Sequence, residues 1–385
     1  AYTVPEVGYD FALQVTFTNT SQVAQPLISS LLMNETLTMA TQSSGFLPGM
    51  PTQRPMLIYS SDVDTEHEDL EGYCADDEQA PIFQQSGQKL NFVGFDKHYF
   101  IQAIQPAGGT TYDLLTQKTG APIGDACQVS TVLSQDQGNV NPGTSVNLRF
   151  DGFFGPKVLD VLSASNPALE ESVNLGFFGF IAKPLLYGID FLYGVLGNYG
   201  LAIIALTLVL KILFYPLMKT TAVSMHKMKK LNPQMQALRE KYKDDKQKQQ
   251  QELMKFMSQH KINPAKGCLP ILPQIPVFFA FYQVLAQAIE LRHAPFYGWI
   301  QDLSAADPYF ITPILWGACM FVQQKLTPTT GMDKTQERIM QFFPLIFVGL
   351  MLSLPAGMMI YLLTNTITSI AQQKWLNAKV EKLAV

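Results

Sequence analysis

The sequence has 385 residues, of which 47% are hydrophobic and 15% are charged. Soluble domains carry about 25% charged residues, so this composition argues against an ordinary soluble protein and indicates a membrane protein. The net charge of -4 conceals a segregation of charge. Residues 1–150 hold sixteen acidic and five basic residues, whereas residues 219–268 hold twelve of the 27 basic residues and four acidic ones. The chain begins at Ala1 without a signal peptide, so we expect a missing N-terminal anchor and a truncated first domain.

Residues 1–150 have the pattern of a β domain. Apolar residues alternate with other residues at positions 11–17, 129–133 and 146–150, as in strands with one buried face. Clusters of Gly, Pro, Asn and Ser separate these runs, and no helical periodicity interrupts them. The pattern predicts an antiparallel β-sandwich.

The N-terminal region also contains two cysteines and an acidic run. Cys74 and Cys127 could form a disulfide in an oxidising compartment, and two free thiols are the alternative. The acidic run at residues 62–71 has His67 where an EF-hand loop requires glycine. We therefore interpret the run as a solvated acidic loop and expect no metal site.

Five apolar stretches predict a helical membrane core over residues 198–376. They cover residues 201–218, 269–291, 309–322, 339–354 and 356–370. A transmembrane helix needs about 20 apolar residues, so the last three stretches are short unless flanking polar residues are included. Residues 173–196 contain Lys183, Asp190, Pro184 and four glycines. We therefore expect residues 151–197 to form a linker and an amphipathic helix in the membrane surface rather than a span.

The basic residues predict the orientation of the core. The basic segment at residues 219–268 separates the first and second stretches, so the positive-inside rule places it in the cytoplasm. With five spans, the short tail at residues 377–385 is cytoplasmic as well. The β domain is external if residues 173–196 lie in the membrane surface, and internal if they span. The candidate disulfide favours the external placement.

The basic segment has the pattern of a helical hairpin. Asn232 and Pro233 predict a helix start, and narrow apolar stripes follow on each side of residues 244–245. The opposite side is basic and includes Lys227, Lys229, Lys230, Arg239 and Lys241. A self-packed hairpin with a solvated basic face is one interpretation. A platform for the ribosome, a nascent chain or anionic lipid headgroups is the other, and the two are compatible.

Lys211 is the most informative residue, because it lies about 12 Å deeper in the first stretch than Lys219. A charged residue inside a span costs about 2.5–3.5 kcal/mol and faces protein or water. Thr207, Lys211 and Tyr215 are four residues apart and share one helix face. Polar residues of other stretches, including Gln274, Tyr361 and Asn365, could converge on that face. We therefore expect a positively charged, hydrated groove, with a lysine that reaches the membrane surface as the alternative.

Catalytic motifs are missing from the sequence. It contains no GxSxG, HExxH or phosphate-binding loop, and no paired carboxylates within the stretches. We therefore predict that the protein is not an enzyme and has no catalytic residue and no cofactor.

The chain resembles the YidC-type membrane protein insertases in a series of ordered motifs. The resemblance covers residues 173–376 and rests on these segments: Gly197–Gly200, Lys211, Tyr215–Leu217, Asn232–Pro233, Asn263–Pro264, Gly267–Cys268, Pro270–Gln274, Glu290–Arg292, Trp299–Ile300, Asp302–Ser304, Asp307–Tyr309, Pro328–Thr330 and Pro355–Gly357. It implies five core spans around a hydrophilic groove, a cytoplasmic helical hairpin and an external β-sandwich, in the bacterial inner membrane.

The resemblance also implies roles for individual residues. The groove cation, usually arginine in the family, aligns with Lys211, which keeps the charge but loses the fork of donors. Residues that align with groove-lining or substrate-contacting positions are Thr207, Tyr215, Gln274, Ile275, Phe278 and Tyr361. The implied partners are nascent membrane proteins, the Sec translocon and the lipid bilayer, with the ribosome and the signal recognition particle receptor as further candidates. Direct recognition of nucleic acid is not expected.

An insertase and membrane chaperone is therefore the leading hypothesis. A small-solute transporter predicts internal repeats, and we find none in the sequence. A receptor built on the β domain would lose its function if residues 1–150 were deleted, whereas an insertase should lose little.

Overall fold

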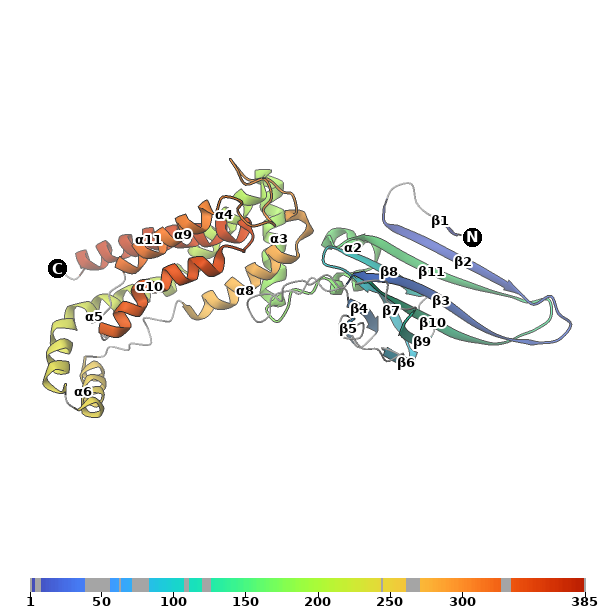
Figure 1. Ribbon diagram of the computed structural model, residues 1–385, viewed down its shortest axis with the longest axis horizontal. Helices are drawn as coiled ribbons and strands as arrows, with labels where there is room; N and C mark the ends of the chain where they lie inside the picture. Colours follow the sequence, from blue (N-terminus) through green and yellow to red (C-terminus); the bar gives the residue numbers. More distant parts are fainter. Residues whose placement is uncertain are drawn as a thin grey trace. The chain divides into compact units, whose positions relative to one another are not determined.

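The computed structural model describes residues 2–3, 8–38, 56–61, 64–70, 83–106, 111–119, 126–243, 245–260, 271–326 and 334–383. The chain forms two compact units. The first consists mainly of residues up to Asn174 and is built of strands, and the second consists mainly of residues from Leu175 and is built of helices. Figure 1 shows the strands and helices of the two units with their labels.

The first unit contains two antiparallel sheets. The seven-stranded sheet has the order β1-β2-β11-β8-β7-β4-β5, and the four-stranded sheet has the order β3-β10-β9-β6. The strands of the first sheet are β1 (Tyr2–Thr3), β2 (Asp10–Thr18), β4 (Met56–Ser61), β5 (Thr65–Asp69), β7 (Leu90–Asp96), β8 (Phe100–Pro106) and β11 (Ser145–Pro156). The strands of the second sheet are β3 (Gln25–Thr38), β6 (Phe83–Gln88), β9 (Tyr112–Lys118) and β10 (Ala126–Val140). The predicted sandwich is confirmed.

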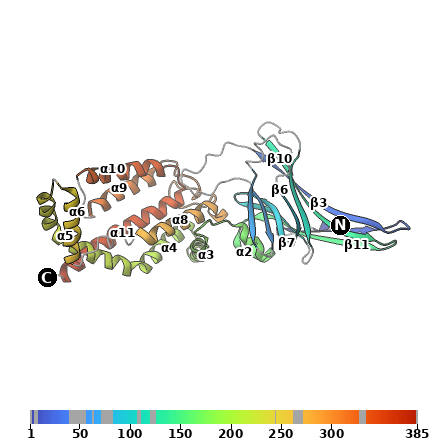
Figure 2. The ribbon, with the colours of Figure 1, turned by 90° about the horizontal axis from the view of Figure 1, so that it is seen from below.

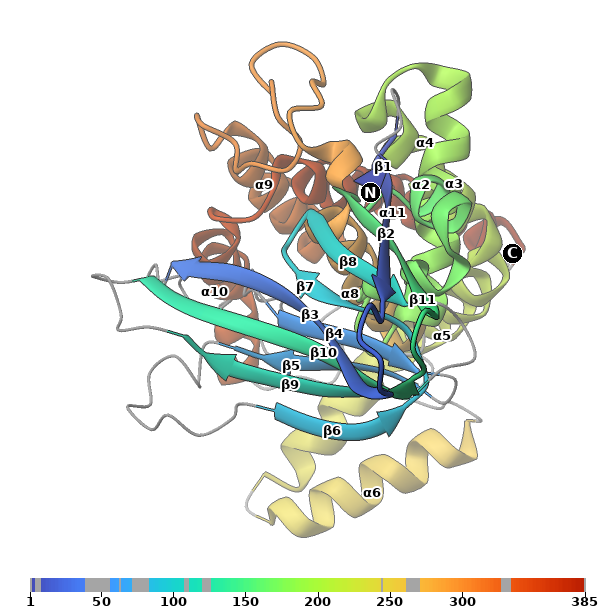
Figure 3. The same ribbon diagram turned by 90° about the vertical axis from the view of Figure 1, so that its right-hand side faces the viewer.

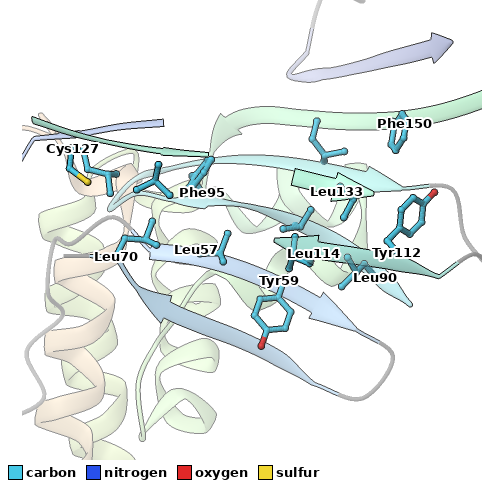
Figure 4. Close-up of a cluster of buried hydrophobic side chains, with 14 of the residues drawn as sticks. Leu57, Tyr59, Leu70, Leu90, Phe95, Tyr112, Leu114, Cys127, Leu133 and Phe150 are labelled. Atoms are coloured by element: carbon cyan, nitrogen blue, oxygen red, sulfur yellow. The ribbon is translucent and has the colours of Figure 1, made fainter. Parts of the chain in front are cut away.

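The core of the sandwich lies between the two sheets. Figure 4 shows side chains of both sheets in this cluster, among them Phe95, Leu114, Leu133 and Phe150. Because successive side chains of a strand point to opposite faces, the alternating apolar residues at 129–133 and 146–150 place Val129, Leu133, Leu148 and Phe150 in one buried layer. The apolar alternation read from the sequence is thus the cause of the inter-sheet packing.

The first unit extends beyond the boundary that the sequence predicted at residue 150. Strand β11 runs to Pro156, and α2 (Leu159–Ser165) and η1 (Pro167–Ser172) follow it. Leu162 and Leu169 of these helices pack on Phe153 and other residues on the outer face of the seven-stranded sheet. The segment predicted as a linker is therefore partly a cover for this sheet, because β11 has apolar residues on both faces.

Two other predictions concern the N-terminal region. Residues 65–69 form strand β5 beside β4 and not the predicted acidic loop, since the acidic side chains can face outward at a sheet edge. Cys127 is buried in the core and is engaged in a disulfide. Its predicted partner, Cys74, lies outside the described residues, so that pairing stays a prediction.

The second unit consists of helices, shown from a second direction in Figure 2. They are α3 (Gly179–Leu196), α4 (Tyr199–Leu213), α5 (Tyr215–Lys241), α6 (Lys246–Gln259), α8 (Ile271–Gln287), η2 (Ile289–Leu291), α9 (Ile311–Leu326), α10 (Lys334–Met351) and α11 (Ala356–Leu383). Helix α11 continues through most of the predicted tail at residues 377–385. Among the described helices, only α3 is long and apolar enough by itself to cross a membrane. Helix α4 and the first turns of α5, bent by 55°, form a second candidate if they are taken together.

Helices α5 and α6 pack against each other as a helical hairpin, and Figure 3 shows the two helices next to each other. Met228 and Met235 of α5 pack against Leu253 of α6, and the Gln249 side chain donates a hydrogen bond to the Arg239 carbonyl at 2.6 Å. The predicted helix start at Pro233 is wrong, because α5 is continuous from Tyr215 and contains this proline. The end of the predicted hairpin, from residue 261, lies outside the described residues.

A buried ion pair connects the last residue of β7 to the residue that follows β11 in the first unit. The Lys157 ammonium lies 2.9 Å from the Asp96 carboxylate, and both side chains are less than a tenth exposed. The ammonium also donates to the Ser172 carbonyl at 3.4 Å. Burial raises the pKa of Asp96 to about 6, because the desolvation outweighs the opposing effect of Lys157.

Replacing Lys157 by Met leaves the Asp96 carboxylate buried without its partner, and we expect the first unit to be destabilised by about 3–5 kcal/mol. Arg149→Ala is the matched control, because Arg149 pairs with Asp151 at 3.0 Å on the surface and such pairs contribute about 0.2–1 kcal/mol. Hydrogen exchange of the strands in the intact, solubilised chain measures both effects. Equal losses of stability in the two variants would contradict a stabilising role of the buried ion pair.

The pH dependence of the same variant provides a second readout. A carboxyl whose folded-state pKa exceeds its unfolded value contributes stability at low pH, and that contribution is lost as the pH rises through the folded pKa. In Lys157→Met, protonation of Asp96 removes the unpaired charge. The loss of stability of the first unit relative to the parent protein is therefore expected to be smaller at about pH 5 than at about pH 8.

Candidate functional site

Helix α4 positions the predicted groove lysine. Asn198 caps the helix by accepting a hydrogen bond from the Leu201 N–H at 3.0 Å, as a preferred N-cap residue does. Thr207 and Lys211 then lie one turn apart on the buried face of an otherwise apolar helix. The Lys211 side chain is 9% exposed, and its Nζ donates a hydrogen bond to Ser369 Oγ of α11 at 2.7 Å.

Helix α11 provides the polar face opposite Lys211. The Ser369 hydroxyl donates to the Asn365 carbonyl at 2.7 Å, and the Gln372 side chain donates to the Lys211 carbonyl at 3.4 Å. The sequence predicts a polar face on this stretch, but it does not identify Ser369 as the partner of the lysine. The available signal was its spacing of four residues from Asn365, which places both on one face.

A partly open pocket lies between α4, α5, α8 and α11. Five of its lining residues were predicted from the sequence, namely Thr207, Lys211, Gln274, Tyr361 and Asn365. The remaining lining residues are Leu210, Phe214, Leu217, Met218, Pro273 and Val277. Residues from four helices, up to 158 positions apart in the chain, thus line one pocket together with Lys211.

Three of the predicted groove residues do not line this pocket. The helix is broken at Phe214, so Tyr215 begins α5 and its ring lies 5.9 Å from that of Trp375. The spacing of four residues after Lys211 therefore no longer places Tyr215 on the face of Thr207. On α8, Ile275 is 47% exposed, and Phe278 stacks edge-to-face with Phe279.

The pocket is small and is bounded by an aromatic pair. It encloses about 460 Å³ of empty space, part of which is open to solvent. The rings of Tyr361 and Phe281 stack 4.3 Å apart, and both residues are buried.

The predicted basic residues all lie on α5. Lys230 and Lys241 are exposed, and Arg239 is half-buried. Lys227 and Lys229 belong to the same helix, but their side chains are outside the described part of the chain. Lys241 and Lys248 lie over the Tyr242 ring, at 5.5 Å and 5.7 Å from its centroid, near the turn of the hairpin. The hairpin therefore combines a packed apolar side with a basic surface.

Ser369→Ala removes the hydroxyl that accepts the hydrogen bond from Lys211. A hydrogen bond to a charged group contributes about 1.5–3 kcal/mol, so we expect a lower melting temperature of the helical unit in differential scanning of the solubilised protein. Thr368→Ala is the matched control, because the Thr368 hydroxyl donates only to carbonyls of its own helix. A decrease of the melting temperature in Thr368→Ala as large as that in Ser369→Ala would contradict a specific contribution of the hydrogen bond between Lys211 and Ser369.

Comparison with known families assigns both units. The profile of the family described as "60Kd inner membrane protein" matches residues 191–383, which contain the whole pocket. The profile described as "YidC periplasmic domain" matches residues 1–187, which contain the β-sandwich. The order of the two matches agrees with the two units of the structure.

Individual relatives agree with these matches. "Membrane protein insertase YidC" of Geobacter sulfurreducens is 43% identical over 300 residues, which is 77% of this chain and 55% of the relative. The protein of the same name from Nitratidesulfovibrio vulgaris is 45% identical over 298 residues, 75% of this chain and 54% of the relative. The chain thus spans about half the length of the curated relatives that it matches. A solved structure described as an active YidC insertase crystal structure with the first transmembrane domain resolved has a TM-score of 0.46 and 20% identity, covering 82% of each chain. The chain belongs to the YidC family of inner-membrane proteins.

Proposed function

We propose that this chain is a membrane protein insertase and chaperone that receives a polar segment of a nascent protein in the pocket around Lys211. The observation that carries the proposal is the convergence of four helices on one buried ammonium beside an open pocket. The names of the relatives support it, because both are membrane protein insertases.

The surface of the helical unit supports its placement in a bilayer. Large apolar side chains project outward from several helices, including Ile212 of α4, Ile314 of α9 and Leu345 of α10, each at least 60% exposed. Such extended apolar surface is uncommon on soluble proteins and marks contact with a membrane or a partner. Helices α4, α8, α9 and α10 have 15 to 18 residues, about 22–27 Å at 1.5 Å per residue. We infer five spans, formed by α4 with the start of α5 and by α8, α9, α10 and α11, across a locally thin bilayer.

The orientation follows from the basic hairpin and the β-sandwich. The hairpin of α5 and α6 lies in the cytoplasm by the positive-inside rule, and the C-terminus follows to the same side. The disulfide of Cys127 favours an oxidising compartment for the sandwich, which agrees with the match to a periplasmic domain. With both assignments, α3 lies in the membrane surface, although its length and composition would also allow a span.

Lys211 is the group that gives the pocket its chemistry. A lysine that reached the membrane surface would direct its ammonium toward the end of the helix, whereas Nζ of Lys211 is directed to Ser369 of α11. The ammonium has further donors available for a carboxylate or a carbonyl of a substrate. The polar end of a substrate binds at this pocket, and its apolar part remains in contact with the lipid. The polar end then has a shorter apolar distance to cross.

The hairpin is the proposed contact for components of the cytoplasm. Its self-packed apolar side leaves Lys230 and Lys241 exposed, and such side chains attract ribosomal RNA, a nascent chain or anionic headgroups through charge. We propose that the protein acts on small substrates alone and on larger ones beside the Sec translocon, with the ribosome and the signal recognition particle receptor as further partners. The mechanism requires binding and release, and no bond is made or broken, so we propose no catalysis.

Substitutions at Lys211 test the proposal in cells depleted of their own insertase. We expect Lys211→Arg to support growth and insertion of a small double-spanning substrate, because the positive charge is retained. Lys211→Glu is expected to reduce insertion about tenfold or more, because like charges in a desolvated contact cost several kcal/mol and 1.4 kcal/mol is a factor of ten. The insertion efficiency of Lys211→Ala should lie between those of Lys211→Arg and Lys211→Glu.

Lys219→Glu is the control for charge reversal, because Lys219 is exposed and does not line the pocket. Efficient insertion by Lys211→Glu at parental protein levels would exclude attraction by the ammonium. Insertion would then depend on the apolar surface and on thinning of the bilayer.

A further inference from the structure

The C-terminal half of α11 meets the start of α5 through two aromatic rings. The rings of Trp375 and Tyr215 lie 5.9 Å apart. Gln372, about one turn before Trp375, donates a hydrogen bond to the carbonyl of Lys211 at 3.4 Å. The ring contact therefore lies about one turn beyond the level at which α11 binds the pocket lysine. Trp375 is nevertheless 52% exposed, so one ring of the pair is open to the surroundings of the protein.

Two exposed lysines flank this tryptophan in α11. The Nζ of Lys379 lies 4.9 Å from the centroid of the Trp375 ring, as residues four apart on one helix face allow. Lys374 directly precedes the tryptophan, and both lysines are exposed. Tyr215, Lys374, Trp375 and Lys379 together form a surface that we call the α5–α11 seam.

The seam is positively charged and has free donors. Residues 199–239 and 356–380, which include this part of both helices, contain no Asp or Glu. Among the described residues, neither Lys374 nor Lys379 forms an ion pair, and the Trp375 indole N–H and the Tyr215 hydroxyl have no hydrogen-bond partner. Two ammonium groups and two neutral donors are therefore available to an anion.

The length of α11 places the seam at a boundary of the membrane. Trp375 follows Ala356, the first residue of the helix, by 19 positions, which is about 28 Å at 1.5 Å per residue. The hydrocarbon core of a bilayer is about 30 Å thick. Tyr309 is 66% exposed and lies near the other end, where Ala306 forms a β-bridge with Pro355. Since Trp and Tyr prefer the level of the headgroups, both ends of this distance carry the expected side chains.

An anionic phospholipid is the ligand that fits the seam. Its phosphate accepts hydrogen bonds from ammonium and indole donors, whereas a zwitterionic lipid also carries a cation, which the lysines repel. Ile212 and Leu213, which shortly precede Tyr215, are 72% and 65% exposed and offer apolar surface to the acyl chains. A lysine that only extended to the membrane surface would need no aromatic partner, but Lys379 lies over the Trp375 ring.

We propose that the α5–α11 seam binds the headgroup of an anionic phospholipid of the inner leaflet. Lys374 and Lys379 pair with the phosphate, while Trp375 and Tyr215 lie at the boundary of the hydrocarbon core. The inference rests on the placement of the helices in the bilayer given in the proposed function. Because the seam lies about one turn from Lys211, a bound headgroup holds the pocket at a fixed depth below the inner surface.

Quenching of tryptophan fluorescence by brominated lipids tests the site in the whole chain. The protein is reconstituted into vesicles of equal parts phosphatidylglycerol and phosphatidylcholine, and either one lipid or the other carries bromine on its acyl chains. The surface charge is then the same in both kinds of vesicle. The difference between the parent and Trp375→Phe isolates the emission of Trp375 from that of Trp299 and Trp316, the other two tryptophans. A chain with Trp299→Phe and Trp316→Phe gives the same readout if Trp375→Phe fails to assemble.

We expect brominated phosphatidylglycerol to be preferred over brominated phosphatidylcholine at Trp375 by about tenfold or more. A basic residue near an anionic membrane contributes roughly fivefold to binding. Lys379→Gln should therefore lower the preference about fivefold, and Lys374→Gln with Lys379→Gln should remove it. Both lysines are exposed, so these substitutions leave the packing of the helical unit unchanged.

Lys248→Gln is the matched control, because Lys248 is exposed and lies over an aromatic ring, that of Tyr242, but belongs to the hairpin. It removes the same charge and should leave the preference unchanged. A loss in Lys248→Gln as large as that in Lys379→Gln would overturn the site in favour of attraction by the whole basic surface.

Two further outcomes separate this inference from the proposed function. Equal quenching of Trp375 by the two brominated lipids would overturn the headgroup site and leave α11 in the bilayer. The absence of quenching by either lipid would overturn both the site and the proposed span of α11. The measurement needs no substrate, so it does not depend on whether the chain inserts proteins.

Discussion

The helical unit is organised around the burial of one ammonium group. A charged group in an apolar interior is unfavourable unless it is hydrogen-bonded, and Lys211 reaches this condition through Ser369 of α11. The contact requires α4 and α11 to lie side by side with their polar faces inward. It also leaves apolar side chains on the outward faces, so that one arrangement provides a largely apolar pocket with an ammonium group in its wall and an apolar outer surface.

The two units stabilise their buried charged groups in different ways. In the sandwich, Asp96 and Lys157 neutralise each other within a closed apolar layer, and the pair has a structural role. In the helical unit, Lys211 donates a hydrogen bond to the neutral hydroxyl of Ser369 and lines the pocket.

Periodicity explains which features could be predicted from the sequence. The strands at residues 11–17, 129–133 and 146–150 follow from alternation, and the convergence of Thr207, Lys211, Gln274, Tyr361 and Asn365 agrees with helical spacing and the resemblance to the family. The helix break at Phe214 has a local signal in Pro216, which lies in the first turn of α5 and disfavours helical backbone at the residue before it. The Ser369 contact and the contact between the Tyr215 and Trp375 rings depend on tertiary packing between distant segments, for which one sequence has no local signal.

Photocross-linking from the pocket to a stalled nascent membrane protein tests the central claim most directly. A cross-linking residue at Gln274, which lines the pocket, is compared with one at Ile314, which projects from α9 at 60% exposure. We predict that the polar segment of the substrate cross-links to position 274 and not to position 314. Cross-links from position 314 alone would contradict a polar pocket as the receiving site and would place the substrate on the apolar surface.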